Sequence, residues 1–116
     1  MKGQMTDTLR IWHILDAINE VEHYLNEVSY EDYLLKSEKR FATIKQVEII
    51  GEACNNISQV LKDAHPEIEW RLINGFRNIS IHEYFAVNFH IVWEIAQNDL
   101  PVLKLAFLKI LEGPST

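Results

Sequence analysis

Four side chains with chemical potential lie close together in one short stretch of the chain, from Arg77 to Tyr84. If this stretch is an α-helix, Tyr84 lies about 20° from Arg77 around the axis, and Asn78 and His82 lie about 40° apart on the neighbouring stripe. Arg is a permanent cation with a planar fork that suits phosphate oxygens, and His can exchange a proton near neutral pH. Asn can orient either group, and Tyr offers a hydroxyl. The spacing therefore predicts one polar helix face that carries all four.

This set of groups suits the cleavage of a phosphodiester without a metal ion. RNA carries its own nucleophile, the 2′-OH, so the protein has to supply only proton transfer and a positive group beside the phosphorus. His82 and Arg77 are the predicted providers. A simpler interpretation stays open, in which His82 and Tyr84 end a helix and Arg77 forms a surface ion pair. Spacing alone does not decide between the two.

The residues around the motif predict a helix that starts near 68–70 and ends near 83. Leu72, Phe76 and Ile79 lie on one side of it and form an apolar face that should be buried. Gly75 lies at the edge of the polar face. Because it has no Cβ, it would allow another backbone to approach closely there.

The rest of the chain has apolar residues at steps of three and four, which is typical of amphipathic helices. Helices are predicted over about 7–28, 29–36, 37–65 and 89–112, with His65 and Pro66 closing the third of these. The last keeps its phase through Pro101, so it should be one long helix kinked near Gln97, whose carbonyl loses its partner. The predicted fold is all-α, an antiparallel bundle of four to five helices in a single domain over residues 1–116. The predicted core contains Ile11, Ile14, Ile18, Val47, Ile50, Cys54, Leu72, Phe76, Trp93, Leu103 and Phe107.

The charge of the chain limits how it can bind nucleic acid. Its net charge is −6 and its pI is near 5.3, which argues against a broad basic face. RNA would therefore bind locally, on a basic strip, unless these cations only solvate helix faces. The candidate cations of the strip are Lys36, Lys39, Arg40, Arg71 and Arg77.

The compartment follows from cysteine usage and from the absence of membrane signals. Cys54 is the single cysteine, so no internal disulfide can form, and its place on an apolar stripe predicts a small core residue rather than a nucleophile. There is no basic and apolar leader, and no apolar run is long enough to cross a bilayer. We expect a soluble cytoplasmic protein that does not contact a membrane.

The order Arg77, Asn78, His82, Tyr84, with four residues between Arg and His and one between His and Tyr, resembles the signature of HEPN ribonuclease toxins of the HepT type. The similarity covers nearly the whole chain. A local departure is Glu69, where the family often has Pro, and it leaves the start of the motif helix in question. Other matching positions are Ile49 to Ala53, Pro66, Trp70, Gly75, Val92 and Trp93, and Leu100 and Pro101.

The resemblance implies the toxin of a type II toxin–antitoxin system, a metal-independent endoribonuclease with catalytic Arg77, Asn78 and His82 and with no cofactor. It also implies a nucleotidyltransferase antitoxin of the MNT type that AMPylates Tyr84. Glu52 lies on the helix that packs beside the motif in this family. It is a candidate orienting partner for Arg77 or His82, or else half of a solvated acid pair with Glu48.

The resemblance implies a homodimer as well, in which the two motifs meet at the interface. Arg77 and His82 would lie about 140° apart on one helix, which is a poor geometry for straddling a phosphate, and a two-fold contact would bring in a second copy of each. The alternative function is a non-catalytic nucleotide-binding or accessory subunit of a nucleotidyltransferase. Its motif would then serve only as a phosphate clamp.

Overall fold

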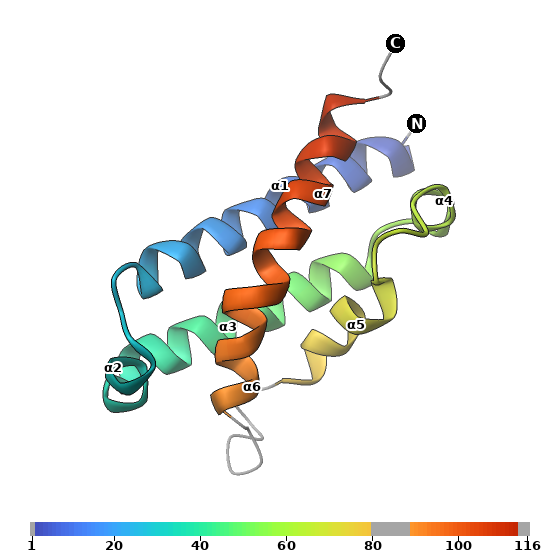
Figure 1. Cartoon of the computed structure of the whole chain (residues 1–116). Helices are drawn as coiled ribbons and strands as arrows, with labels where there is room; N and C mark the ends of the chain where they lie inside the picture. Colours follow the sequence, from blue (N-terminus) through green and yellow to red (C-terminus); the bar gives the residue numbers. More distant parts are fainter. Residues whose placement is uncertain (1, 80–88, 114–116) are drawn as a thin grey trace.

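A computed structural model describes residues 2–79 and 89–113 of the chain, with side chains described from Asp7 onward. These residues form helices and turns and contain no strand, which confirms the predicted all-α fold. In Figure 1, α1 and α3 run antiparallel side by side, α7 crosses α1, and α5 lies along α3. The elements in order are α1 (Lys2–Leu25), α2 (Tyr30–Leu35), α3 (Ser37–Asn55), α4 (Gln59–Ala64), α5 (Trp70–Gly75), the 3-10 turn η1 (Phe76–Asn78), α6 (Phe89–Glu94), the π-helical turn η3 (Ile95–Asp99) and α7 (Leu100–Glu112).

The helices share one core, formed by the apolar stripes that the three-four spacing predicted. Nine predicted core residues are buried, but Trp93 is only partly buried, and Leu72 is 46% exposed. Ile73 is buried in place of Leu72, because α5 directs Ile73 and Phe76, three residues apart, toward α3. None of the helices in the described ranges has the length and apolar character that a bilayer span requires. The confirmed core residues are Ile11, Ile14, Ile18, Val47, Ile50, Cys54, Phe76, Leu103 and Phe107.

The helix predicted over 37–65 is two helices, so its predicted length was wrong. α3 ends at Asn55, and α4 begins after Ser58, whose hydroxyl accepts a hydrogen bond from the Leu61 amide at 3.2 Å. The buried carboxylate of Asp7 accepts hydrogen bonds from the Ser58 amide at 2.8 Å and from the Ser58 hydroxyl at 2.6 Å. Ser58 is thus an N-cap fixed by α1, and this cap provides the backbone partners that a break in the helix requires.

The last helix is continuous through Pro101 with a local change of winding, close to the predicted kink. The turn η3 includes Gln97, and the Leu100 amide donates to the Ile95 carbonyl, five residues earlier. Proline has no amide hydrogen to donate to the carbonyl of Gln97, so an α-helical pattern cannot be complete there. The π-helical turn accommodates this loss and lets α7 continue the apolar stripe.

The motif helix is shorter than predicted. α5 passes into η1, which ends at Asn78, and Ile79 is extended with φ −84° and ψ 90°. A helix through Glu83 is therefore wrong, and the angular relations predicted from it between Arg77 and either His82 or Tyr84 do not apply. The helix changes winding where the backbone of Phe76 and Arg77 presses against α3.

Gly51 on α3 is the point of this close approach. A Cβ on Gly51 would lie 2.3 Å from the Arg77 nitrogen and 2.8 Å from the Phe76 carbonyl carbon, distances that real Cβ atoms do not adopt. Gly75 was predicted to leave room for another backbone. A Cβ added there would meet no atom of the described residues within 4 Å, so no described backbone uses that room and the prediction stays untested. The glycine that the packing requires is therefore the one on α3.

These two glycines form a matched pair for a stability test. Gly75→Ala should leave stability unchanged or raise it by up to about 1 kcal/mol, because Ala is the better helix former and its methyl group meets nothing. Gly51→Ala should lower the free energy of unfolding by about 1–3 kcal/mol, because the methyl group overpacks the contact. Urea denaturation of the two variants checks this, and equal stabilities would contradict the contact.

Candidate functional site

Arg77 lies on η1 with its side chain directed away from the core. Its backbone nitrogen lies against Gly51, and its guanidinium Nε lies 3.7 Å from a carboxylate oxygen of Glu52. The two side chains are 39% and 57% exposed, so the pair contributes little to stability, about 0–1 kcal/mol. The long contact involves Nε, and no ion pair among the described residues involves the terminal amino groups of the guanidinium. The structure thus places Glu52 beside Arg77, and its orienting role stays a prediction.

The remaining motif residues are only partly covered by the described structure. Asn78 follows Arg77 on η1 and is exposed. His82 and Tyr84 lie outside the described residues, so their predicted roles are not tested. The structure therefore brings Arg77 on η1 and Glu52 on α3 together, with Asn78 as the next residue on η1.

Phe89 is the first described residue after the motif, and it contacts both α2 and α3. The Tyr33 hydroxyl donates to the Phe89 carbonyl at 2.8 Å, and the Arg40 guanidinium lies 4.8 Å from the centroid of the Phe89 ring. Burial raises the pKa of the Tyr33 hydroxyl well above its usual value, which keeps it protonated as a donor. Sequence reasoning missed this contact, because no local spacing connects residues 56 positions apart.

The predicted basic strip is not continuous in the described structure. Arg40 precedes Glu52 by twelve residues on α3, which separates them by about 18 Å along the axis. The guanidinium of Arg40 is engaged locally, because it donates to the Leu34 carbonyl and lies over Phe89. Lys36 and Lys39 precede Arg40, so this group lies at the other end of α3 from Arg77, whereas Arg71 lies on α5.

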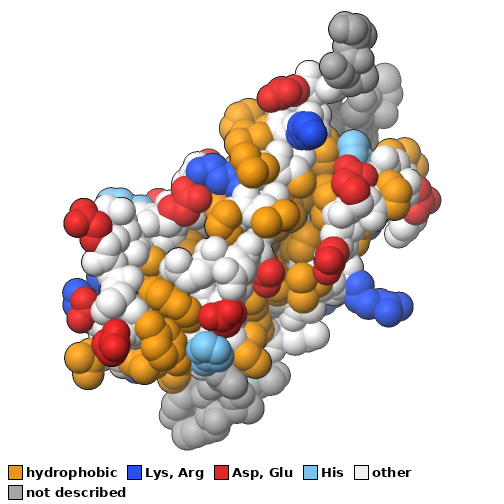
Figure 2. Space-filling view, viewed as in Figure 1, with side chains coloured by type: hydrophobic (Ala, Val, Ile, Leu, Met, Phe, Trp, Pro, Cys, Tyr) orange, Lys and Arg blue, Asp and Glu red, His pale blue; other side chains and the backbone are white. Residues whose placement is uncertain are grey.

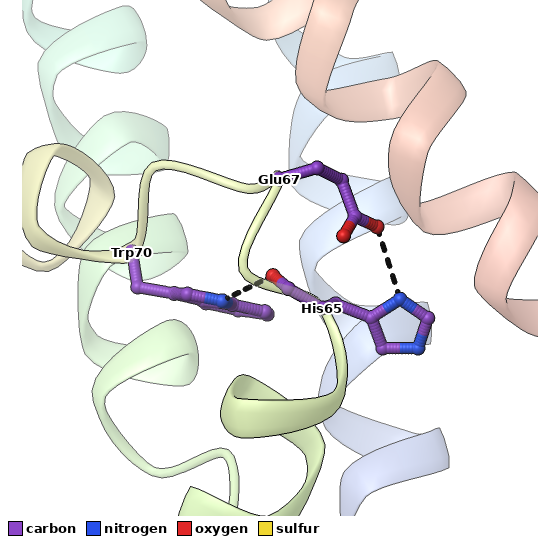
Figure 3. Close-up of polar contacts among 3 residues, drawn as sticks. All are labelled: His65, Glu67 and Trp70. Carbon is purple, nitrogen blue, oxygen red and sulfur yellow. Dashed lines mark hydrogen bonds and ion pairs between the residues drawn. The ribbon is translucent and has the colours of Figure 1, made fainter.

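The start of α5 is defined by Trp70 rather than by the residue before it. Glu69 occupies the N-cap position but its side chain accepts no capping hydrogen bond. Instead the indole N–H of Trp70 donates to the His65 carbonyl at 2.8 Å, and His65 Nδ1 lies 3.0 Å from Glu67 (Figure 3). The departure at Glu69 is thus tolerated, since contacts within the α4–α5 loop fix where the helix begins.

The α7 side of α5 is acidic and apolar. A cavity of about 300 Å³ between α5 and α7 is lined by apolar side chains together with Glu67, Glu69 and Asp99. Burial, and then the nearby charges of Glu69 and Glu94, raise the pKa of Asp99. Figure 2 shows acidic side chains among hydrophobic ones on the face that α7 crosses. A polyanion would be repelled there, so any nucleic acid should approach from another side.

Neither a reactive cysteine nor a metal site is found among the described residues. Cys54 is fully buried, and burial raises the pKa of its thiol to about 11, which agrees with a core role rather than a nucleophilic one. Within the described ranges, no three His, Cys, Asp or Glu side chains converge as metal ligands would.

The chain matches known ribonuclease-like proteins over most of its length. Residues 14–110 match the family described as "Ribonuclease HepT-like". A "Probable ribonuclease HepT" from Thermococcus cleftensis is 40% identical over 97 residues, which cover 84% of this chain and 88% of that protein. A putative RNase from Methanocaldococcus jannaschii is 32% identical over 94 residues, covering 81% and 86%.

A putative RNase from Caldanaerobacter subterraneus is 33% identical over 100 residues, which cover 86% of this chain and 89% of that protein. No solved structure matches the chain. The match of the family over residues 14–110 agrees with the resemblance that the motif and its surroundings predicted. The chain belongs to the ribonuclease HepT-like family.

Proposed function

We propose that the chain is a metal-independent endoribonuclease that uses Arg77, Asn78 and His82. Membership of a ribonuclease family supports RNA as the substrate. The observation that carries the proposal is the position of Arg77: its backbone is held against Gly51 while its guanidinium stays exposed beside the carboxylate of Glu52. An arginine whose backbone is held by packing and whose guanidinium is exposed to solvent suits the binding of a phosphate that enters from solvent.

In the proposed reaction the RNA supplies the nucleophile. The 2′-oxygen forms a bond to phosphorus as its proton is taken by a base, and the bond from phosphorus to the 5′-oxygen breaks as that oxygen gains a proton. The products are a 2′,3′-cyclic phosphate and a 5′-hydroxyl. His82 exchanges the protons, Arg77 stabilises the charge on the crowded phosphorus, and Asn78 orients them.

The proposal includes a homodimer whose two motifs meet at one cleft. The angle of about 140° between Arg77 and His82 no longer argues for it, because η1 ends at Asn78. The argument that remains is chemical: one His is needed to accept a proton and another group to donate one, and a two-fold interface provides two copies of His82. The resemblance of the motif supports this arrangement.

We also propose that the chain is the toxin of a type II pair in the cytoplasm, neutralised by an MNT-type nucleotidyltransferase. That enzyme would transfer AMP from ATP to Tyr84: the Tyr84 oxygen bonds to the α-phosphorus, and pyrophosphate leaves. The modification would add a negative charge and a bulky nucleoside to the proposed cleft, and it would exclude RNA by repulsion and by occupying that cleft.

Arg77→Ala should abolish RNA cleavage, with a loss of at least about 100-fold in rate, because the charge on the phosphorus is no longer stabilised. Arg77→Lys should also lose most activity, since an ammonium cannot bind two phosphate oxygens in parallel. Both variants should unfold at the urea concentration of the wild type, because Arg77 is exposed and its ion pair is weak. Cleavage of a labelled RNA checks this.

The matched control is Lys104→Ala, which removes an ion pair of α7 with Glu22 on α1, away from the motif. This variant should cleave RNA at the wild-type rate. Full activity of Arg77→Ala would refute the proposed role, and a wild-type protein that binds nucleotide but cleaves no RNA would favour the accessory-subunit alternative.

Tyr84→Phe should abolish AMPylation, because the ring is kept and only the acceptor hydroxyl is lost. Co-expression with an MNT-type nucleotidyltransferase, followed by intact-protein mass spectrometry, should show one added AMP on the wild type and on Tyr30→Phe, the control. Cleavage by Tyr84→Phe should persist if the hydroxyl serves only regulation. An AMP yield on Tyr84→Phe equal to that of the wild type would exclude this residue as the acceptor.

A further inference from the structure

A groove runs between α4 and α5 on the side of α5 that leads to Arg77. Its volume is about 650 Å³, and it is open to solvent. Two cations, an indole ring and one carboxylate contribute to its walls, which differ in this way from the acidic cavity on the α7 side. The lining residues are Gln59, Lys62, Asp63, Pro66, Trp70, Arg71 and Asn74.

The groove carries local positive charge in a chain whose net charge is −6. Arg71 is exposed, and none of the ion pairs formed by the described residues involves it or Lys62. The carboxylate of Asp63 accepts a hydrogen bond from the Gln59 side chain at 2.9 Å, within α4. The two cations are therefore available to an anion that enters the groove.

Trp70 provides an aromatic surface whose orientation is fixed. Its indole N–H is bonded to the His65 carbonyl (Figure 3), and its ring meets Phe107 edge to face, with centroids 5.9 Å apart. The Lys62 ammonium lies 6.0 Å from the ring centroid, at the outer limit of a cation–π contact. An aromatic ring in a fixed orientation with a cation beside it is the combination on which single-stranded nucleic acids stack a base and bind its phosphate.

The groove lies on the same side of α5 as the candidate site, although Arg77 itself does not line it. Trp70, Asn74 and Arg77 are spaced four and three residues apart, so they lie along one side of α5 and η1. Asn74 lines the groove, and Arg77 follows one turn later. Trp70 and Arg77 are separated by about 10 Å along the axis, a span that a strand bound at Arg77 would cross with its next nucleotides.

We propose that the groove between α4 and α5 binds single-stranded RNA next to the phosphate that is cleaved at Arg77. A base stacks on Trp70, and Lys62 and Arg71 bind the flanking phosphates. This inference rests on the proposed function and deepens it, because it assigns a strand path and residues that set the preference for unpaired RNA.

Binding to an uncleavable ligand tests the groove separately from catalysis. The probe is a fluorescein-labelled 12-nucleotide RNA with 2′-O-methyl groups throughout, titrated with wild-type protein at several salt concentrations and followed by anisotropy. The double variant Lys62→Ala/Arg71→Ala should bind about tenfold more weakly, and the slope of log affinity against log salt should fall by about 1–2. Lys109→Ala, which removes an exposed cation outside the groove, should change affinity less than twofold.

Crosslinking gives a readout that does not depend on variants. The same RNA with 4-thiouridine, irradiated on the wild-type protein, should attach to the peptide that spans residues 59–74. An affinity and salt slope of the double variant equal to those of Lys109→Ala, with no crosslink in 59–74, would overturn the groove and leave the proposed function standing. Groove-dependent binding by a protein that cleaves no RNA would overturn the proposed function and leave the groove standing. Absence of any binding would overturn both.

Discussion

The close contact between Gly51 and the backbone of Phe76 and Arg77 is the constraint on which the candidate site depends. A side chain larger than hydrogen at position 51 fits only if the backbone shifts, because its Cβ would lie 2.3 Å from the Arg77 nitrogen. The contact lets the Phe76 ring enter the core, and it leaves the side chain of the next residue at the surface. Core packing thus positions Arg77 beside Glu52, the neighbour of Gly51 on α3. The weak ion pair between Arg77 and Glu52 contributes little to this positioning.

α3 supports both described ends of the segment that carries His82 and Tyr84. Before the segment, the backbone of η1 packs against Gly51 of α3. After it, the guanidinium of Arg40 on α3 lies over the ring of Phe89. Tyr33 on α2 fixes the Phe89 carbonyl as well. A single helix therefore positions the described residues on both sides of this segment, so the core packing of α3 fixes where Arg77 and Phe89 lie. The two sides of α5 differ in charge, with acids toward α7 and cations toward α4, so a net acidic chain still has one side that suits RNA.

Much of the fold could be predicted from sequence, because apolar spacing reports directly which side of a helix is buried. This worked for Ile11, Ile14 and Ile18 on α1 and for Leu103 and Phe107 on α7. Prediction from apolar spacing failed where a contact between residues distant in sequence decides where a helix ends. Asp7 ends the second long helix through Ser58, 51 residues away, and the approach to Gly51 shortens the motif helix. Local sequence could not distinguish Gly51 from Gly75, since a glycine does not show which backbone it meets. The proximity of Glu52 to Arg77 came from the family resemblance, because helix spacing carries no information on which helices pack together.

In the proposed function, RNA is cut by its own 2′-OH with help from protein side chains alone. The most direct measurement is the chemistry of the new RNA ends, determined after incubation of the purified wild-type protein with a labelled RNA in the presence and absence of EDTA. We expect equal cleavage with and without EDTA, with 2′,3′-cyclic phosphate and 5′-hydroxyl ends. Cleavage that stops on chelation, or products with 3′-hydroxyl and 5′-phosphate ends, would contradict it.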